Sequence, residues 1–280
     1  MTRIGLIQTK CSENQKDNID KIEQLIYKAA SQNAKIISLQ ELATTKYLAH
    51  KQNIDYFKFA EENSGNSIAM AEKLAKNLKI YLLLPYFEKD ITTYYNSVIV
   101  FSPEGKVIGK YRKTHIPQNT SYQEKYYFKP GNIEYPIFHT EYGNFGISTC
   151  WDHWFPEVQR IYGLKGADIV FSPTSIGYNY SPECYIDHDY KKTWQAMLVG
   201  QAITSGFYFA IINRTGKEDE IDFYGSSFII SPKGKIVASL NEEEENCLVQ
   251  EIDINEARNW KVMLQFNRDR RTELYKSLVE

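Results

Sequence analysis

Cysteine is scarce in this 280-residue chain, and its four copies are widely scattered, at Cys11, Cys150, Cys184 and Cys247. They include no CxxC pair, so the sequence suggests neither a disulfide framework nor a zinc ribbon. The five histidines do not cluster near the cysteines at the spacing of metal ligands either. We therefore expect no metal, and the chemistry inferred below requires no cofactor.

Long apolar runs and an excess of positive charge are also lacking. No apolar stretch approaches the ~20 residues that a membrane-spanning helix needs, and the N-terminal segment has no signal-peptide core. The net charge is −2, and no polybasic stretch offers a surface for nucleic acid or anionic lipid. We expect a reduced, soluble, cytoplasmic protein whose partner is a small molecule rather than nucleic acid or a membrane.

Hydrophobic and aromatic residues are plentiful, at 42% and 14% of the chain, and 21 residues are tyrosine. Because no linker or change of composition separates the halves, we predict a single domain over residues 1–280. A surface rich in tyrosine favours a homo-oligomer, either a dimer or an assembly of dimers. The C-terminal segment, about residues 260–280, is expected to pack on a neighbouring subunit. The alternative is that this segment folds back on its own subunit.

The order of apolar patterns repeats once along the chain. In the first half, apolar runs predict strands, and a 3.6-residue period predicts helices around residues 19–30 and 67–78. These strands are Arg3–Gln8, Ile36–Leu39, Ile80–Pro85, Ser97–Phe101 and Lys106–Tyr111. In the second half, helices are expected from near Pro156 and over Lys191–Thr204. The strands there are Phe145–Thr149, Asp168–Ser172, Phe207–Asn213, Ser227–Ser231, Lys235–Ser239 and Leu248–Ile252.

This repeated pattern predicts the fold. Strands that follow helices read as continuous apolar runs, as expected when both faces of a sheet are covered. Two similar half-sheets, each with helices on one side, would bury their other faces against each other. We therefore predict an α/β fold, a four-layer α-β-β-α sandwich. A single doubly wound sheet is the alternative.

Three polar residues stand just past predicted strands, where functional sites collect in α/β folds: Glu41, Lys113 and Cys150. A thiol at the junction of a strand and a helix can feel positive potential, which favours the thiolate. A nearby carboxylate could take its proton, and a nearby ammonium could stabilise an oxyanion. Spacing alone leaves another interpretation open, in which the cysteine is a small core residue and the two charged residues are solvated.

The sequence around these residues supports the catalytic interpretation. Cys150 lies in STCWDHWFPE and Lys113 in GKYRKTHIP, and both strings closely resemble motifs of the nitrilase superfamily of carbon–nitrogen hydrolases. The resemblance runs from Arg3 to about Arg271. It implies the sandwich fold of the nitrilase type, with Cys150 as nucleophile, Glu41 as general base and Lys113 as the cation beside the oxyanion. The substrate would be a small ureido or amide compound, cleaved through a thioester.

The same resemblance assigns further positions. Glu124, in SYQEKYYFKPG, matches a second glutamate of the superfamily that lies near the lysine, although the string by itself reads as an exposed polar loop. The main-chain N–H of Trp151 is a candidate oxyanion donor. Trp151 and Trp154 are expected to wall the substrate pocket, with a place in the core as the alternative. We expect structural positions for the other cysteines and for His115 and His153.

Within the superfamily, YRKTHIP, YQEKYYFKPG and CWDHWFPE most resemble the N-carbamoylputrescine amidases. That subgroup produces putrescine, carbon dioxide and ammonia in polyamine biosynthesis. One motif differs from that of the subgroup: this sequence has Lys192-Thr193-Trp194 where the subgroup often has Asp-His-Trp. The preceding segment, residues 177–190, also differs and is expected to be a loop at the pocket rim. In that loop, Glu183 is our candidate for the contact with a cationic amine.

Other functions stay open at this point. Amidases of the ω-amidase or β-ureidopropionase type share the same chemistry. A catalytically silent, metabolite-binding member of the fold would show no thiol-dependent ammonia release. A true nitrilase would release ammonia from nitriles and act slowly on ureido compounds.

Overall fold

A computed structural model describes residues 1–181 and 184–280 of the chain. Its helices are α1 (Gln15–Ser31), α2 (Asn66–Leu78), α3 (Pro156–Leu164), α4 (His188–Ser205) and α5 (Ile254–Leu264), and two short 3-10 helices near the site are η3 (Glu124–Tyr126) and η4 (Cys150–Trp154). The first strands are β1 (Thr2–Gln8), β2 (Ile36–Leu39), β3 (Tyr81–Asp90), β4 (Thr93–Phe101), β5 (Val107–Arg112), β6 (Phe138–Thr140), β7 (Gly143–Ile147) and β8 (Ile169–Thr174). The later strands are β9 (Gly177–Ser181), β10 (Cys184–Ile186), β11 (Tyr208–Asn213), β12 (Thr215–Glu218), β13 (Ile221–Tyr224), β14 (Phe228–Ile230), β15 (Ile236–Ser239) and β16 (Asn246–Ile252).

The described strands form two six-stranded sheets and one four-stranded sheet. The first six-stranded sheet has the order β16-β1-β2-β3-β4-β5, and the second has the order β15-β14-β11-β8-β7-β6. In each, three central strands run parallel, β1, β2 and β3 in one and β7, β8 and β11 in the other. An antiparallel hairpin follows them in both sheets, with Gly105 or Gly234 at positive φ in its turn. The repeat seen in the sequence is therefore present in the sheets.

The strand predicted at Leu248–Ile252 ends the second series of elements in the sequence but belongs to the first sheet in space. Observed as β16, it pairs antiparallel with β1 along its whole length, from Thr2 opposite Ile252 to Gln8 opposite Asn246. The chain thus returns from the second half to close the edge of the first.

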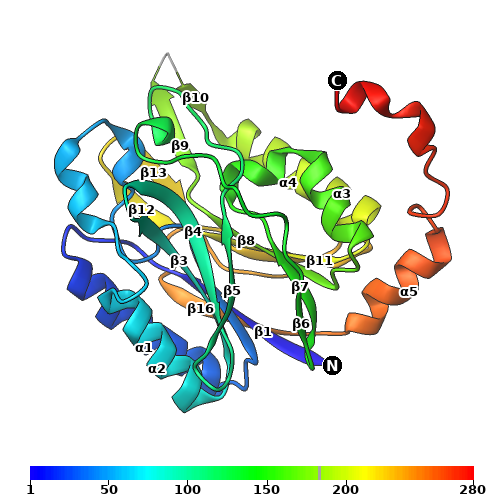
Figure 1. Cartoon of the computed structure of the whole chain (residues 1–280), viewed down its shortest axis with the longest axis horizontal. Helices are drawn as coiled ribbons and strands as arrows, with labels where there is room; N and C mark the ends of the chain where they lie inside the picture. The colour runs from blue at the N-terminus through cyan, green and yellow to red at the C-terminus, as the bar shows by residue number, and fades with distance from the viewer. Residues whose placement is uncertain (182–183) are drawn as a thin grey trace.

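Four layers stack in the order helix, sheet, sheet, helix (Figure 1). Between the sheets, Ile4 and Leu6 of β1 pack in one buried cluster with Phe145 and Ile147 of β7. Ile7, on the opposite face of β1, belongs instead to the cluster beneath α1 and α2. This alternation is what a strand with one face toward each neighbouring layer requires. The observed layers are those of the predicted α-β-β-α sandwich.

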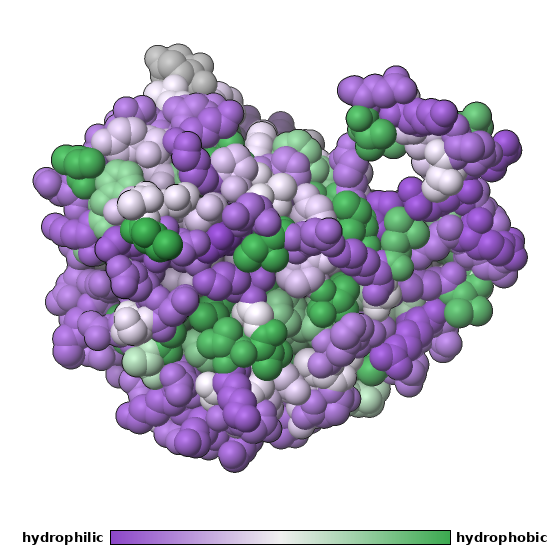
Figure 2. All heavy atoms as spheres, viewed as in Figure 1, coloured by the Kyte–Doolittle hydropathy of each residue, from purple (hydrophilic) through white to green (hydrophobic). Residues whose placement is uncertain are grey.

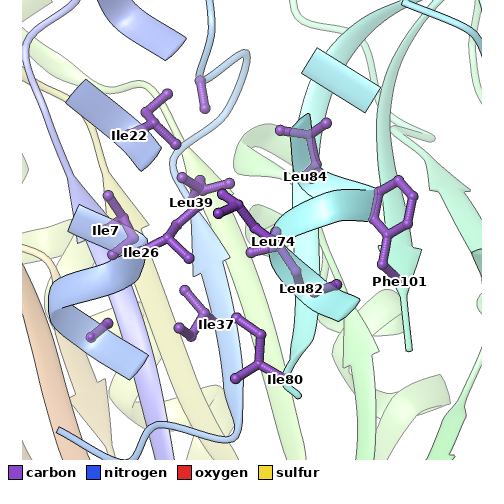
Figure 3. Packing of buried hydrophobic residues seen from close by; sticks show 14 of the residues in the cluster. Ile7, Ile22, Ile26, Ile37, Leu39, Leu74, Ile80, Leu82, Leu84 and Phe101 are labelled. Atoms are coloured by element: carbon purple, nitrogen blue, oxygen red, sulfur yellow. The ribbon is translucent and has the colours of Figure 1, made fainter. Parts of the chain in front are cut away.

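Apolar side chains at helical spacing hold the outer layer of the first half. Ile22 and Ile26 of α1 and Leu74 of α2 lie over Ile37 of β2 and Leu82 of β3 (Figure 3). Each is almost wholly buried. Burying such a side chain is worth about 1.5–3 kcal/mol relative to leaving it exposed. This packing fixes where β2 lies and therefore places the polar residues that follow it.

The second half has an equivalent outer layer. The helix predicted to begin near Pro156 is α3, with the proline at its first position. Together with α4, it covers the second sheet through Tyr162, Leu198 and Phe209. No helix in the described parts of the chain is both long enough and apolar enough to cross a bilayer.

The four-stranded sheet, with the order β10-β9-β13-β12, was not predicted. Its strands β9 and β10 form a hairpin within residues 177–190, so the expectation of a loop there was wrong. Helix α4 also begins inside this segment, at His188, because the Asp187 side chain accepts hydrogen bonds from the main-chain N–H groups of Asp189 and Tyr190. Strands this short show too little alternation to be recognised from sequence.

The C-terminal segment contains a further unpredicted helix, α5. Trp260, in this helix, was expected to reach a neighbouring subunit, but its Nε1 donates to the carbonyl of Ile203 in α4 at 3.0 Å. Beyond α5 the tail (residues 265–280) stands off the sandwich, with an opening beneath it (Figure 2) and a cavity of about 580 Å³ between it and α3 and α4. Exposed apolar side chains in this region are Val262, Met263, Phe266, Leu274, Leu278 and Val279.

We predict that a second copy of the chain covers this tail, because several large apolar side chains are otherwise left in water. Light scattering at micromolar concentration should show a dimer or an assembly of dimers. The double substitution Leu274→Glu and Leu278→Glu should shift the mass toward smaller species. Ile91→Glu is the matched control, since Ile91 is 83% exposed in the β3–β4 turn and should leave the mass unchanged. A wild-type monomer at this concentration would contradict the prediction.

Candidate active site

The ends of strands from both large sheets deliver polar side chains to one edge of the sandwich. Glu41 follows β2, Lys113 follows β5 and Cys150 follows β7. Strands β2 and β5 run in the same direction, because β3 is parallel to β2 and two antiparallel steps lead from β3 to β5. Their carboxyl ends therefore meet at one edge, where α/β proteins commonly place sites. Glu124, which begins η3, completes the group.

The ammonium of Lys113 lies at the centre of this group. Its Nζ donates to Glu41 Oε1 at 2.8 Å and to Glu124 Oε1 and Oε2 at 2.8 and 2.7 Å. All three side chains are completely buried. Two neutral side chains add donors: Asn96 Nδ2 bonds to Glu41 Oε1 at 2.8 Å, and Tyr47 Oη bonds to Glu124 Oε1 at 2.8 Å. Glu41 Oε2 has no hydrogen-bond partner among the described residues.

Cys150 starts the turn η4 with a left-handed backbone, φ 46°. Such a conformation costs roughly 1 kcal/mol or more for a residue with a side chain, so surrounding contacts must hold it. The fully buried Asp152 carboxylate supplies them by accepting hydrogen bonds from Thr149 N at 3.1 Å, His115 N at 2.8 Å and Tyr111 Oη at 2.7 Å. These contacts tie the cysteine turn to β5 and to the residues just beyond it.

Burial and charge set the protonation states. Burial raises the pKa of the Cys150 thiol well above its usual range, and the Glu41 charge raises it further, against the lowering effects of Lys113 and of a main-chain hydrogen bond from Ser175. Burial alone would lower the pKa of Lys113, but the two carboxylates outweigh it and hold that pKa above its usual value. Burial, opposed by Lys113 and assisted by the Glu41 charge, raises the pKa of Glu124 to about 7.

This arrangement has the parts that acyl transfer needs. The resting thiol is neutral, so attack on a carbonyl carbon requires a base. Glu41 Oε2 is a buried oxygen to which no described residue donates a hydrogen bond. The Lys113 ammonium is held as a fixed positive charge, the kind of group that stabilises a developing oxyanion in acyl transfer.

A cavity of about 210 Å³ opens at Cys150. Its described lining residues are Pro117, Asn119, Tyr122, Cys150, Trp151, Trp154, Ile176, Tyr185, Ile186 and Tyr190. Both tryptophans that the sequence analysis assigned to the pocket lie in this wall. No Asp, Glu, Lys, Arg or His is among these lining residues. In residues 1–181 and 184–280, no group of three His, Cys, Asp or Glu side chains lies where it could hold a metal ion.

Of the other residues considered from sequence, Glu183 falls outside the described residues. Cys247 and His153 are not among the described residues that line the cavity. Cys247 belongs to the apolar cluster beneath α1 and α2. His153 is wholly buried, and burial, with the Lys113 charge, lowers its pKa to about 3. Its Nε2 accepts from the Trp194 indole at 2.8 Å, so its Nδ1 carries the proton toward Ser172, and it holds a structural position as expected.

Two residues of the site were missed by sequence reasoning, Asn96 and Tyr47. Asn96 begins the run NSVIVF in β4, and an amide side chain at the start of an apolar run was the available signal in the sequence. Nothing in the sequence distinguishes Tyr47 from the other 20 tyrosines.

Comparison with known proteins identifies the family. The model of the carbon-nitrogen hydrolase family matches residues 3–262. The chain belongs to this family. An N-carbamoylputrescine amidase of Oryza sativa subsp. japonica is 36% identical over 99% of the chain and 94% of that protein. A citrullinase of Francisella tularensis subsp. tularensis is also 36% identical, over 99% of the chain and 98% of that protein.

A solved structure confirms the fold class. The carbon-nitrogen hydrolase of Helicobacter pylori G27 is 31% identical, with a TM-score of 0.93 over 100% of the chain and 98% of that protein. The chain is thus a nitrilase-superfamily hydrolase that acts on carbon–nitrogen bonds other than peptide bonds.

For this carbon–nitrogen hydrolase we predict that Cys150→Ala lowers the rate of hydrolysis by about 10⁴-fold or more, because the variant lacks the thiol that we expect to form the thioester. Glu41→Gln and Lys113→Ala should lower the rate of hydrolysis nearly as much. The measurement is ammonia release from a panel of amides and ureido compounds. Cys247→Ala is the control, since that thiol is buried in an apolar cluster and its loss should leave turnover per folded molecule unchanged. Wild-type turnover without Cys150 would refute its role.

We also predict a pH dependence of stability that comes from Glu124. A carboxyl whose pKa rises on folding contributes stability that is complete below its unfolded pKa, ~4.3, and is lost as pH rises through about 7. The free energy of unfolding of the wild type minus that of Glu124→Gln should therefore fall between pH 5 and 7, by at most about 1.4 kcal/mol per pH unit. Urea titrations at several pH values measure it. A difference that rises with pH would show that Glu124 stays charged.

Proposed function

We propose that this hydrolase cleaves N-carbamoylputrescine to putrescine, carbon dioxide and ammonia, with Cys150 as nucleophile. The proposal is carried by one arrangement. A neutral thiol that interacts with a buried ammonium and with a carboxylate, one oxygen of which has no partner among the described residues, opens on a cavity whose described lining is uncharged and rich in aromatic rings.

The first half-reaction forms a thioester. Glu41 takes the thiol proton as the Cys150 sulfur attacks the ureido carbon, and the carbonyl oxygen becomes an oxyanion that faces Lys113 and a main-chain N–H, that of Trp151. The intermediate collapses when the C–N bond breaks, and the protonated Glu41 gives its proton to the leaving nitrogen. Glu41 is then a carboxylate again.

The second half-reaction releases the acyl group. Glu41 takes a proton from water, the hydroxyl oxygen adds to the thioester carbon, and the C–S bond breaks as the sulfur recovers its proton. The leaving nitrogen of the first half-reaction departs as ammonia, so the acid released here is the N-substituted carbamic acid of putrescine, which decomposes to carbon dioxide and putrescine. Glu124, half-protonated near neutral pH, holds Lys113 in place through both steps.

The cavity wall supports a cationic substrate. Five of its ten described lining residues are aromatic: Tyr122, Trp151, Trp154, Tyr185 and Tyr190. Aromatic faces attract a protonated amine by about 0.5–2 kcal/mol each, most strongly where water is excluded. Trp154 is central, because its ring lies 6.1 Å from that of Trp151 and 5.6 Å from that of Tyr190. From sequence, Glu183 remains our proposed carboxylate partner for the same amine.

The relatives leave two ureido substrates to compare. The Oryza protein is an N-carbamoylputrescine amidase and the Francisella protein is a citrullinase. Citrulline carries a carboxylate, and a carboxylate leaving water needs a cation or several donors. No lysine or arginine is among the described residues that line the cavity, which favours the substrate without a carboxylate.

We predict the highest kcat/KM for N-carbamoylputrescine in a panel that also contains citrulline, carbamoyl-β-alanine and N-pentylurea, an uncharged compound of the same length. Trp154→Leu should raise KM for N-carbamoylputrescine about 3- to 30-fold more than for N-pentylurea, because only the cation loses an aromatic face. Trp154→Phe, which keeps an aromatic ring, is the matched variant. Its KM for N-carbamoylputrescine should lie between the values of the wild type and of Trp154→Leu.

Each other outcome has a definite meaning. Faster turnover of citrulline or carbamoyl-β-alanine would overturn the polyamine assignment and leave the amidase chemistry intact. Faster hydrolysis of nitriles than of ureido compounds would identify the activity as that of a true nitrilase. If Trp154→Leu raised KM equally for the charged and the uncharged compound, the proposed aromatic contact with the amine would be wrong.

A further inference from the structure

Arg214, directly after β11, is a wholly buried cation that is not among the residues lining the cavity. A guanidinium has five N–H donors, and here each has an acceptor. The acceptors are the carbonyl oxygens of Glu41 at 2.9 Å, Leu42 at 3.0 Å and Thr45 at 2.9 Å, Glu218 Oε1 at 2.8 Å and Ser175 Oγ at 3.3 Å. Three of the five contacts therefore go to the main chain of the segment that begins with the catalytic base.

That segment needs external support. Residues 41–47 contain no strand or helix, and Leu42 has a left-handed backbone with φ 48°. A leucine in this conformation is strained by roughly 1 kcal/mol or more, and Arg214 bonds to its carbonyl and to that of the preceding residue. At the other end of the segment, Glu218 Oε2 accepts from Tyr47 N at 2.6 Å.

These contacts close a ring of hydrogen bonds around the site. Arg214 and Glu218 bond to each other and together hold both ends of residues 41–47. The ends carry the two side chains that contact the central pair of Lys113 and Glu124. In order, the ring runs Glu41, Lys113, Glu124, Tyr47, Glu218, Arg214 and back to Glu41.

We propose that Arg214 and Glu218 are positioning residues for the general base: they fix the main chain of residues 41–47 so that Glu41 Oε2 faces the Cys150 thiol. Neither Arg214 nor Glu218 is among the described residues that line the cavity. The inference rests on the proposed roles of Cys150 and Glu41, but not on which ureido or amide compound is hydrolysed.

The geometry explains why an arginine occupies this position. A planar fork of five donors reaches three carbonyls, a carboxylate and a hydroxyl at once, whereas a lysine has three donors on a single atom. Arg214→Lys keeps the charge and loses the fork, so the segment should relax around Leu42 and move the base.

The experiment measures the base directly through the thiol. Because the Cys150 thiol is neutral at rest, its alkylation by iodoacetamide near pH 7 depends on Glu41 taking the proton. Arg214→Lys should lower kcat by about 10²-fold with KM little changed, since a displacement near 1 Å costs that much in rate. Its alkylation rate at pH 7 should fall in parallel and recover only at high pH. Glu218→Gln, which replaces one acceptor oxygen by an amide nitrogen, should lower kcat and the alkylation rate at pH 7 in the same way, but by smaller factors.

Arg258→Lys is the matched control. Arg258 makes a two-bond ion pair with Asp168, at 3.0 and 2.8 Å, at the start of β8 and therefore at the opposite end of that strand from Ser175. This variant should keep the wild-type kcat and alkylation profile. Thermal unfolding of every variant shows whether a lower rate comes only from a smaller fraction of folded protein. A smaller folded fraction would reduce the number of active sites but leave the pH profile of alkylation unchanged.

A folded Arg214→Lys with wild-type kcat and wild-type alkylation at pH 7 would overturn the proposal. If that variant does not fold, Glu218→Gln decides in the same way. Glu41→Gln separates the two levels of inference: if its alkylation profile matches the wild type, the assigned base is wrong. If alkylation depends on Glu41 while no ureido compound is cleaved, only the proposed substrate is wrong.

Discussion

The ammonium of Lys113, enclosed between Glu41 and Glu124, is the interaction on which the rest of the site depends. Removing an ammonium from water costs several kcal/mol, so the charge persists there only because two carboxylates and their donors surround it. The carboxylates are buried as deeply and need the ammonium in return. This mutual dependence joins the ends of β2 and β5 to the start of η3. It engages one oxygen of Glu41, while the other accepts no hydrogen bond from the described residues.

Sequence reasoning was most informative where the signal is local. The repeated apolar runs predicted the two sheets with helices outside, which the structure has. An apolar run followed by a reactive side chain singled out Glu41, Lys113 and Cys150, of which Glu41 and Lys113 form a buried ion pair, and their catalytic roles stay predictions. Sequence reasoning failed where the partners are distant. Asn96 meets Glu41 across 55 residues and Arg214 meets it across 173, and neither period nor composition reports such contacts. The strands of the small sheet have three to five residues, too few for alternation to be read.

Charge is divided sharply within the site. The buried ion pairs of Lys113 with Glu41 and Glu124 form a closed network, whereas no acidic or basic side chain is among the described residues that line the cavity at Cys150. Uncharged walls lower the local dielectric constant, so a fixed charge near them acts more strongly than it would in water. In the proposed function, ring faces and shape, together with Glu183, would select the distal end of the substrate.

The return of β16 to the first sheet has a consequence for synthesis on the ribosome. Strand β1 pairs on one side with a segment that is translated more than 200 residues later. Until then one edge of β1 exposes unpaired main-chain groups, the kind of edge that recruits other chains. The nascent first half is therefore an incomplete sheet that awaits nearly the whole polypeptide, so early emergence of Glu41 and Lys113 yields no working enzyme. The pairing of β16 with β1 then joins the start and the late part of the chain.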